Sequence, residues 1–337
     1  MNIAIVHNRV SDEDSPDAKD VLLQVDAVSS ALHRLGHGVE TIACTLDLET
    51  MRSGLERKRP DLVFNLVEDL GGYGRLIHLF PFILDALGIE YTGSPAEAIM
   101  FSSHKTMAKE IMLRNGLPTP AWVGPYPAHR FFSQIPPGSG RWIIKSVWEH
   151  ASIGLDETSV VETDSPLILT GEFEKRCDTL GGTCFAEEYI EGREFNLSLL
   201  AGPDGPEVLP PAEIIFEGYT PDMVRIVDYG AKWEEDSHGY HHTPRSFDFG
   251  DGDANLLDRL RNIAKSCWRE FGLAGYARVD FRVDRFDNPH ILEINANPCL
   301  SPDAGFAAAV ERAGLDFDRA VARIVADGMR NRKQGEP

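Results

Sequence analysis

The stretch that decides the fold runs from Gly275 to Pro298 and reads GYARVDFRVDRFDNPHILEINANP. Residues 277–283 and 290–295 each alternate small or apolar side chains with polar ones, which is typical of half-buried strands. Asp287 and Asn288 between the two runs supply turn chemistry. The sequence therefore predicts a β-hairpin.

Three oxygen donors gather on one face of this hairpin. Residues two apart on a strand share a face, so Glu293 and Asn295 point the same way, and Asp280 meets them from the partner strand. Two carboxylates and an amide oxygen, without Cys or His, suit magnesium better than zinc. An acidic hairpin with a solvated face is the alternative, but Arg278, two residues before Asp280, suits an anionic substrate.

This pattern resembles the ATP-grasp superfamily, and within it the D-alanine–D-alanine ligase group. In that family an Asp, a Glu and an Asn in an R-x-D … E-x-N-x-x-P arrangement hold two magnesium or manganese ions on the phosphates of ATP. The residues that match are Arg278, Asp280, Glu293, Asn295 and Pro298. The resemblance covers residues 1 to about 328 and implies a three-part ATP-grasp fold.

The composition bounds the class of protein. A chain of 337 residues is long enough for two or three domains. Its 33 basic and 53 acidic residues give a net charge of −20, which argues against nucleic acid and anionic membranes as partners. The N-terminus lacks a signal-peptide pattern and no apolar run reaches a membrane span, so we expect a cytoplasmic protein. Five cysteines without a C-x-x-C pair are expected to be reduced thiols.

Residues 1–93 are predicted to form an N-terminal doubly wound domain with a parallel sheet, which would serve the substrate. Short apolar runs at 3–6, 39–43 and 61–67 alternate with helical stretches, the first of them at 21–35. The glycine-rich loop at 68–74 follows the third strand, at the edge where such sheets bind ligands, although a tight turn would explain its glycines equally.

Two further units are predicted, a central α+β lid domain at 94–187 and a C-terminal catalytic domain at 188–330. The first contains an amphipathic helix at 102–115 that ends at Gly116, then strands at 141–147, 159–162 and 184–190 with a helix at 167–176. The second contains a hydrophilic loop at 228–253, a helix from about 255 to 271, the hairpin and two short helices.

A loop at 148–154 follows the strand that carries Lys145, and it resembles the family's flexible phosphate loop. Consecutive backbone N–H groups and the Ser152 hydroxyl would face a polyphosphate there, while lysine supplies charge. The resemblance places Lys105 near the α-phosphate and Lys145 near the α- and β-phosphates. Taken singly, each lysine could equally be solvated, and a small-residue turn after a strand is common.

The segment 187–195 resembles the family's E-x-[aromatic]-[aliphatic]-x-G-x-E linker. The resemblance implies that Glu187 and the backbone of Glu188, Tyr189 and Ile190 read adenine. It also implies that Glu194 takes the ribose hydroxyls, as acids do in dinucleotide sites. A charged strand edge with a turn at 191–192 is the alternative.

The segment 228–233, DYGAKW, resembles the family's D-Y-x-x-K-Y, which begins a mobile loop over the substrate. The resemblance places Lys232 on the γ-phosphate, and the polarity of 228–253 suits a lid. Three histidines lie in the same loop, and solvated or substrate-facing roles fit them better than metal ligation. They are His238, His241 and His242.

The sequence departs from the D-alanine ligases where the substrates would lie. A phosphate-loop serine and the tyrosine after the lid lysine are replaced by Ala151 and Trp233. The carboxylate anchor after the hairpin is replaced by residues 299–306, which place the acid Asp303 where an anion was held. In the family a glutamate binds the ammonium group of the first substrate. Glu13 is the candidate for that residue here, and Asp12 or Asp14 would serve as well.

We interpret the chain as an ATP-dependent ligase that joins a carboxylate to an amine through an acyl phosphate. Arg278, with the backbone N–H near Cys299, would stabilise the oxyanion, and Lys232 would assist transfer. The substrates would be small molecules, an amino acid or a similar compound other than a D-alanine pair, and a homodimer is compatible with the sequence. A genuine D-alanine–D-alanine ligase is the alternative, followed by a silent ATP sensor, against which the full set of metal and phosphate residues argues.

Overall fold

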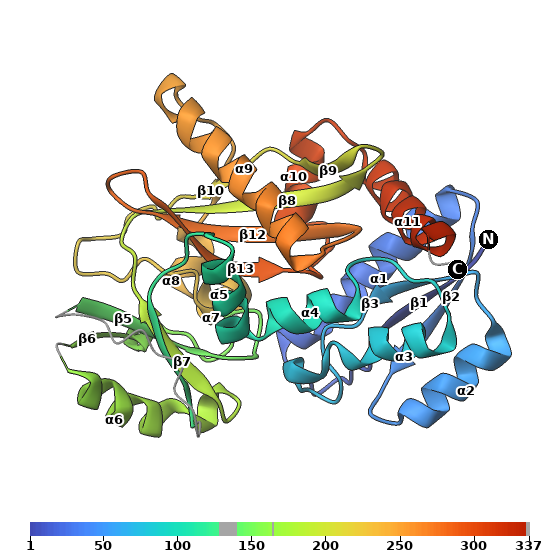
Figure 1. Ribbon diagram of the computed structural model, residues 1–337, viewed down its shortest axis with the longest axis horizontal. Coiled ribbons are helices and arrows are strands. Elements are labelled where there is room, and N and C mark those ends of the chain that lie inside the picture. The colour runs from blue at the N-terminus through green and yellow to red at the C-terminus, as the bar shows by residue number, and fades with distance from the viewer. Residues whose placement is uncertain (128–139, 164, 335–337) are drawn as a thin grey trace.

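The computed structural model describes residues 1–127, 140–163 and 165–334. They form three separate sheets with helices against them, one parallel and two antiparallel in their pairing (Figure 1). This confirms the predicted α/β and α+β class. Within the described ranges, every helix is too short or too polar to span a bilayer. Residues 128–139 and 164 of the predicted central unit lie outside the described residues.

The N-terminal sheet is parallel, as predicted, with strand order β2-β1-β3. Its elements are β1 (Asn2–Asn8), α1 (Pro16–Arg34), β2 (Gly38–Cys44), α2 (Leu48–Lys58), β3 (Leu62–Leu66) and α3 (Leu79–Leu87). Ile3 and Ile5 pack toward α1, while Ala4 and Val6 pack toward α2 and α3. Both faces of β1 are therefore buried, which explains its continuous apolar run.

The second sheet is antiparallel and has the order β4-β7-β5-β6. Its elements, with the two helices that precede it, are α4 (Ala96–Ser103), α5 (Lys105–Arg114), β4 (Trp122–Tyr126), β5 (Gly140–Ser146), β6 (Val160–Thr163), α6 (Pro166–Arg176) and β7 (Cys184–Glu188). The single helix predicted at 102–115 is wrong. The helix is interrupted at His104. The extended backbone of this residue ends α4, and its ring caps α5 by accepting a hydrogen bond from Met107 N at 3.2 Å.

The largest sheet carries the predicted hairpin. Its strands run in the order β11-β10-β8-β12-β13, with β9 paired to β8. The elements are β8 (Arg193–Gly202), β9 (Gly205–Val208), β10 (Ala212–Ile214), β11 (Arg245–Ser246), α9 (Ala254–Phe271), β12 (Tyr276–Val283) and β13 (Pro289–Asn295). Asp280 pairs with Glu293, and a register shift follows Asp280. Val279 and Phe281 pack against α9, which leaves Asp280 on the opposite face.

The segment 228–253 is more ordered than the predicted loop. It forms two short helices, α7 (Tyr229–Trp233) and α8 (His238–His242), before β11. Asp228 caps α7 by accepting from Ala231 N at 2.8 Å, and Ser237 caps α8 by accepting from Tyr240 N at 3.1 Å. Such caps stabilise helix ends locally, and the polarity of the segment did not reveal them.

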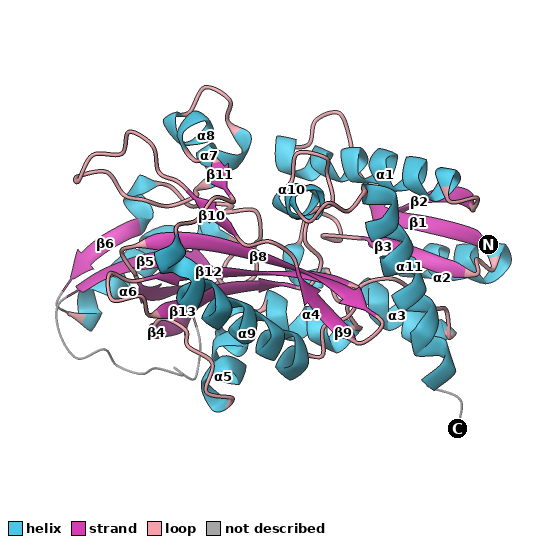
Figure 2. Cartoon of the chain, turned by 90° about the horizontal axis from the view of Figure 1, so that it is seen from above, coloured by secondary structure: helices cyan, strands magenta, loops and turns pink. Residues whose placement is uncertain are grey.

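The chain ends with α10 (Gly305–Arg312) and α11 (Phe317–Gln334), of which the second is long and not short as predicted. Val321 and Ile324 of α11 share one buried core with Ile5 of the N-terminal sheet and Leu200 of the large sheet. Figure 1 shows α11 beside α1, close to the N-terminus, and Figure 2 shows the same end from above. One core therefore joins parts of the predicted units 1–93 and 188–330.

Candidate functional site

One pocket of about 740 Å³ is lined by residues from all three sheets and from the loops between them. Every residue predicted to bind ATP or metal, or to act in catalysis, lines this pocket. They are Lys105, Lys145, Ser152, Glu187, Glu188, Tyr189, Ile190, Glu194, Lys232, Arg278, Asp280, Glu293 and Asn295. The fold thus brings them together, while their individual roles stay predictions.

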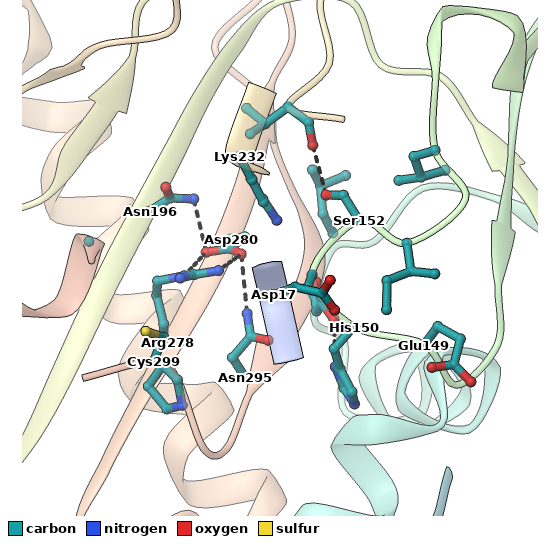
Figure 3. Close-up of a pocket in the computed structure, with 18 of the residues that line it drawn as sticks. Asp17, Glu149, His150, Ser152, Asn196, Lys232, Arg278, Asp280, Asn295 and Cys299 are labelled. Atoms are coloured by element: carbon teal, nitrogen blue, oxygen red, sulfur yellow. Dashed lines mark hydrogen bonds and ion pairs between the residues drawn. The ribbon is translucent and has the colours of Figure 1, made fainter. Parts of the chain in front are cut away.

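Asp280 is buried and anchored by three neighbours. Its carboxylate accepts two hydrogen bonds from Arg278, at 2.7 and 2.8 Å, and one from Asn196 Nδ2 at 2.9 Å. Asn295 Nδ2 donates a further bond at 3.2 Å (Figure 3). Because these donors fix the carboxylate, Asp280 is held in place before anything binds, and Asn295 keeps its amide oxygen for a cation.

Glu293 lies beside nitrogen atoms of two other segments. Lys105 Nζ and His150 Nδ1 each lie 3.4 Å from its Oε1. Burial alone would raise the pKa of Glu293, but Lys105, His150 and Lys232 outweigh burial and hold the pKa well below its ordinary value. Oε1 is buried and accepts no hydrogen bond within the described part of the chain. A buried anionic oxygen of this kind, with Asp280 and Asn295 nearby, fits a hard divalent cation.

Lys232 of α7 reaches toward the same carboxylates, and Figure 3 shows its side chain directed at Asp280. Burial lowers the pKa of Lys232 and nearby Arg278 lowers it further, while Glu293, Asp280 and Glu194 oppose the change. Segment 228–253, the predicted lid, therefore places a desolvated lysine beside the predicted metal ligands.

Glu187 lies between two lysines rather than facing a free space. Its Oε2 is 2.7 Å from Lys109 Nζ, and its Oε1 pairs with Lys145. Lys109 and Glu187 are each only 1% exposed, so the pair is fully desolvated. Glu187, which also lines the pocket, is therefore an ion-pair partner that positions Lys145, and its contact with adenine stays a prediction. Lys109 was not predicted, because a lysine on an amphipathic helix gives no sign that it is buried.

Glu194 is also paired. Its Oε2 lies 2.9 Å from Arg282 Nη2, and the two residues face each other across β8 and β12. Arg282 donates as well to the carbonyl oxygen of Gly192 at 3.0 Å. Glu194 still lines the pocket, so a ribose would meet a carboxylate whose orientation Arg282 sets.

The phosphate loop takes a strained path. Ala151 and Ser152 have φ of 56° and 62°, a left-handed conformation that costs a non-glycine residue about 1 kcal/mol or more. The Ser152 hydroxyl, predicted to face phosphate, instead donates to the Val227 carbonyl at 2.8 Å (Figure 3). Trp233 Nε1 donates to the Ala151 carbonyl at 3.3 Å. The loop is therefore tied to the lid segment by contacts other than the family's serine and tyrosine.

The glycine-rich loop after β3 contacts the phosphate loop. A Cβ on Gly74 would lie 3.2 Å from Glu149 Oε2 and 3.4 Å from the Trp148 carbonyl oxygen. Gly71 and Gly72 have positive φ, as a tight turn requires. Two glycines therefore make the tight turn and the third permits the close approach of the two loops, while ligand binding by this loop stays a prediction.

The acidic wall of the pocket comes from residues that the sequence analysis did not select. Asp17 and Asp20 of α1 and the loop residues Glu68 and Asp69 line the pocket, whereas Glu13, Asp12 and Asp14 do not. The candidate Glu13 therefore stands outside the lining of this pocket, and its role stays a prediction. Helix α1 begins at Pro16, so positions 17 and 20, three apart, share a helix face. Asp20 is held by Ser301 Oγ, which donates at 2.8 Å.

The histidines of α8 do not reach the pocket. His238 and His242 stack with ring centroids 4.0 Å apart, and none of His238, His241 and His242 lines the cavity. Within the described ranges no three His, Cys, Asp or Glu side chains form a group that could hold a metal. The predicted cation site is not such a group, because its third donor is the amide of Asn295.

Stability should fall as pH rises through the titration of Glu68. Burial raises the pKa of Glu68 from 4.5 to about 7, and nearby carboxylates add to burial, against a hydrogen bond from Gln24. The folded protein therefore binds this proton more tightly than the unfolded chain does. The contribution is fully present below about pH 4.5 and lost above about pH 7, and it amounts to at most about 3 kcal/mol. Urea unfolding of the native protein and of Glu68→Gln between pH 4.5 and 8 would measure it.

The Glu68→Gln variant should lose less unfolding free energy than the native protein over that pH range. Parallel curves for the two proteins would show that Glu68 titrates at its ordinary value.

Comparisons with known proteins agree with the geometry. A family model described as "D-ala D-ala ligase C-terminus" matches residues 142–326. The chain is 30% identical to a D-alanine–D-alanine ligase of Moorella thermoacetica, over 89% of this chain and 91% of that one. It is 29% identical to the uncharacterized protein y4sG of Sinorhizobium fredii, over 89% and 85%.

Solved structures share the fold. The D-alanine–D-alanine ligase of Bacillus anthracis, solved in complex with ATP, superposes with a TM-score of 0.73 at 20% identity and covers 100% of both chains. The ligase of Coxiella burnetii gives a TM-score of 0.70 at 14% identity, over 99% of this chain and 96% of that one.

Proposed function

Because this chain belongs to the D-alanine–D-alanine ligase family, we propose that it is an ATP-dependent ligase that joins the carboxylate of one small molecule to the amine of another. The observation that carries the proposal is one pocket in which oxygen donors meet lysines. Lys105 and Lys232 approach Asp280 and Glu293 from two other segments, and Lys145 lines the same pocket.

The reaction proceeds in two steps. An oxygen of the first substrate's carboxylate attacks the γ-phosphorus of ATP and ADP leaves, which gives an acyl phosphate. The amine nitrogen of the second substrate then attacks the acyl carbon, phosphate leaves with the electrons of the broken bond, and the amine loses a proton. Phosphorylation is needed because a free carboxylate would have to expel oxide.

The chain's own residues position the reactants and balance their charge. Magnesium ions bound by Asp280, Glu293 and Asn295 would neutralise the phosphate oxygens. Lys105 and Lys145 would bind the inner phosphates, and Lys232 would approach the γ-phosphate from the lid segment. Adenine recognition falls to the backbone of residues 188–190, because the Glu187 carboxylate is engaged by lysines.

Arg278 is suited to stabilise negative charge at the acyl carbon. Two hydrogen bonds to Asp280 fix the orientation of its guanidinium, and it lines the pocket beside Cys299. With the backbone N–H of Cys299 it would stabilise the oxyanion of the tetrahedral intermediate. A group already oriented before reaction costs no reorganisation when the charge develops.

The substrates are proposed to be an amino acid or similar molecule other than a pair of D-alanines. Trp233 and Ala151 replace the tyrosine and serine of the family, and their contact uses a backbone carbonyl instead of a hydroxyl. Asp17 and Asp20 add carboxyl groups to the lining of the pocket, and so does Glu68, whose pKa burial raises to about 7. These changes support a different specificity, while the residues around ATP are retained.

Incubation with ATP, magnesium and D- and L-amino acids, singly and in pairs, should yield ADP, phosphate and a ligated product. We expect D-alanyl-D-alanine to form at least tenfold more slowly than the best product, since a lost buried hydrogen bond costs roughly tenfold or more in rate. Mass spectrometry identifies the product.

Two outcomes of that screen would contradict parts of the proposal. D-alanyl-D-alanine as the fastest product would establish the alternative, a genuine D-alanine–D-alanine ligase. Binding of ATP without ADP release for any pair would favour the nucleotide sensor.

A further inference from the structure

Arg245 is a pocket residue that the sequence analysis did not select. It begins β11, the edge strand that follows the lid helices, and pairs with Ile214 of β10. Its Nη1 donates to the carbonyl oxygen of Asp303 at 3.0 Å. Arg245 therefore reaches from the large sheet to the loop that precedes α10.

Gly305 lies against this guanidinium. A Cβ on Gly305 would lie 3.4 Å from Arg245 Nε. Gly305 is the first residue of α10, and the N-cap Ala304 offers no side chain to the helix end. Asp303, Ala304 and Gly305 all line the pocket, so the start of this eight-residue helix and Arg245 face the same space. The positive end of a helix dipole adds to the charge of the arginine.

Arg245 has no carboxylate partner within the described ranges, although other arginines of this domain do. Arg193 pairs with Glu213 at 2.7 Å, Arg282 with Glu194 at 2.9 Å and Arg312 with Asp248 at 2.6 Å. Arg278, which also lines the pocket, forms an ion pair with Asp280. Partial burial lowers the pKa of Arg245 and nearby Arg278 lowers it further, while Asp303 and Cys299 oppose the change; the residue as a whole keeps an exposed surface. A negatively charged group of a ligand would offset this cost.

Resting on the ligase function above, we propose that Arg245 is a specificity-determining residue that binds the carboxylate of the amine-donating substrate at the start of α10. A planar guanidinium presents two parallel donors to a carboxylate, which is a more selective contact than one hydroxyl provides. Arg278 then remains available to stabilise the oxyanion of the tetrahedral intermediate. The enzyme consequently selects amino acids over neutral amines as acceptors.

The test compares each accepted amino acid with its carboxamide, which has nearly the same shape but no negative charge. With ATP, magnesium and the best carboxylate donor, the native enzyme should prefer the acid over the amide by about 10- to 100-fold in kcat/KM. Arg245→Gln should lose about that factor with the acid, mainly through KM, and change little with the amide. Arg245→Lys should show an acid preference between those of the native enzyme and Arg245→Gln, because lysine keeps the positive charge but lacks the two parallel donors of the guanidinium.

Arg312→Gln is the matched control, since Arg312 lies at the far end of the same helix and pairs with Asp248 outside the pocket. It should keep the native acid preference. Equal use of acid and amide by an active native enzyme would overturn the assignment of Arg245 and leave the ligase function standing. An equal loss with both acceptors in Arg245→Gln would also overturn it. Absence of ADP release with every pair would overturn the ligase function, and the assignment with it.

Discussion

Replacing Glu293 by Gln should lower ATP-dependent turnover by roughly a thousandfold. The substitution keeps the shape of the side chain but removes the negative charge that Lys105 and His150 face at 3.4 Å. Without that charge, the site loses one of its two carboxylates for a divalent cation, and metal charge on the phosphates is worth several kcal/mol in the transition state. Steady-state phosphate release at saturating ATP and varied magnesium measures the loss.

A matched control separates this effect from a general loss of charge. Glu207 lies on β9, pairs with Arg323 at 2.7 Å and stands outside the pocket, so Glu207→Gln should keep native turnover. Circular dichroism should show both variants folded. Native magnesium-dependent turnover in Glu293→Gln would remove this residue from the metal site.

The second large effect is on stability. Glu187→Gln should lower the free energy of unfolding by about 3 to 5 kcal/mol, the usual result of leaving a buried charge without its partner. Lys109 and Lys145 both pair with this carboxylate, and Lys109 is only 1% exposed. Urea unfolding monitored by tryptophan fluorescence measures the change.

Two comparisons define the origin of that loss. Glu213→Gln, which breaks a pair with Arg193, should cost less, because Arg193 is 34% exposed and keeps its ion pair with Asp253. The double variant Lys109→Met with Glu187→Gln should be less destabilised than the sum of its single changes, because it removes the stranded charge along with the carboxylate. Strict additivity in that cycle would be evidence against the buried pair.

Local pattern predicted the elements whose burial depends on neighbours in the sequence. The alternation in 277–283 and 290–295 was enough for the hairpin, because a strand turns successive side chains to opposite faces whatever lies beyond it. The same rule placed Asp280 and Glu293 together. The strands of the N-terminal sheet were equally predictable from their apolar runs, because a strand that is covered on both faces has few polar positions.

Helix ends, and the short helices within 228–253, were harder to predict from the sequence. The hydrophobic pattern of a helix continues through His104, although the structure has two helices there. The break depends on a single hydrogen bond, which the His104 ring accepts from a backbone N–H. The polar segment 228–253 gave no apolar periodicity, yet Asp228 and Ser237 cap helices within it. Both corrections come from single hydrogen bonds, which composition and periodicity do not register.

By itself the sequence determined the strands, the oxygen donors on the hairpin and the family that they resemble, since these depend on spacing along a few residues. Only the tertiary structure decided that Glu187 is enclosed by Lys109 and Lys145, that Asp17 and Asp20 line the pocket while Glu13 does not, and that Arg245 faces the start of α10. Those contacts join segments far apart in the chain. Their charges are set by which side chains the fold desolvates together, and that is a property of the packed molecule.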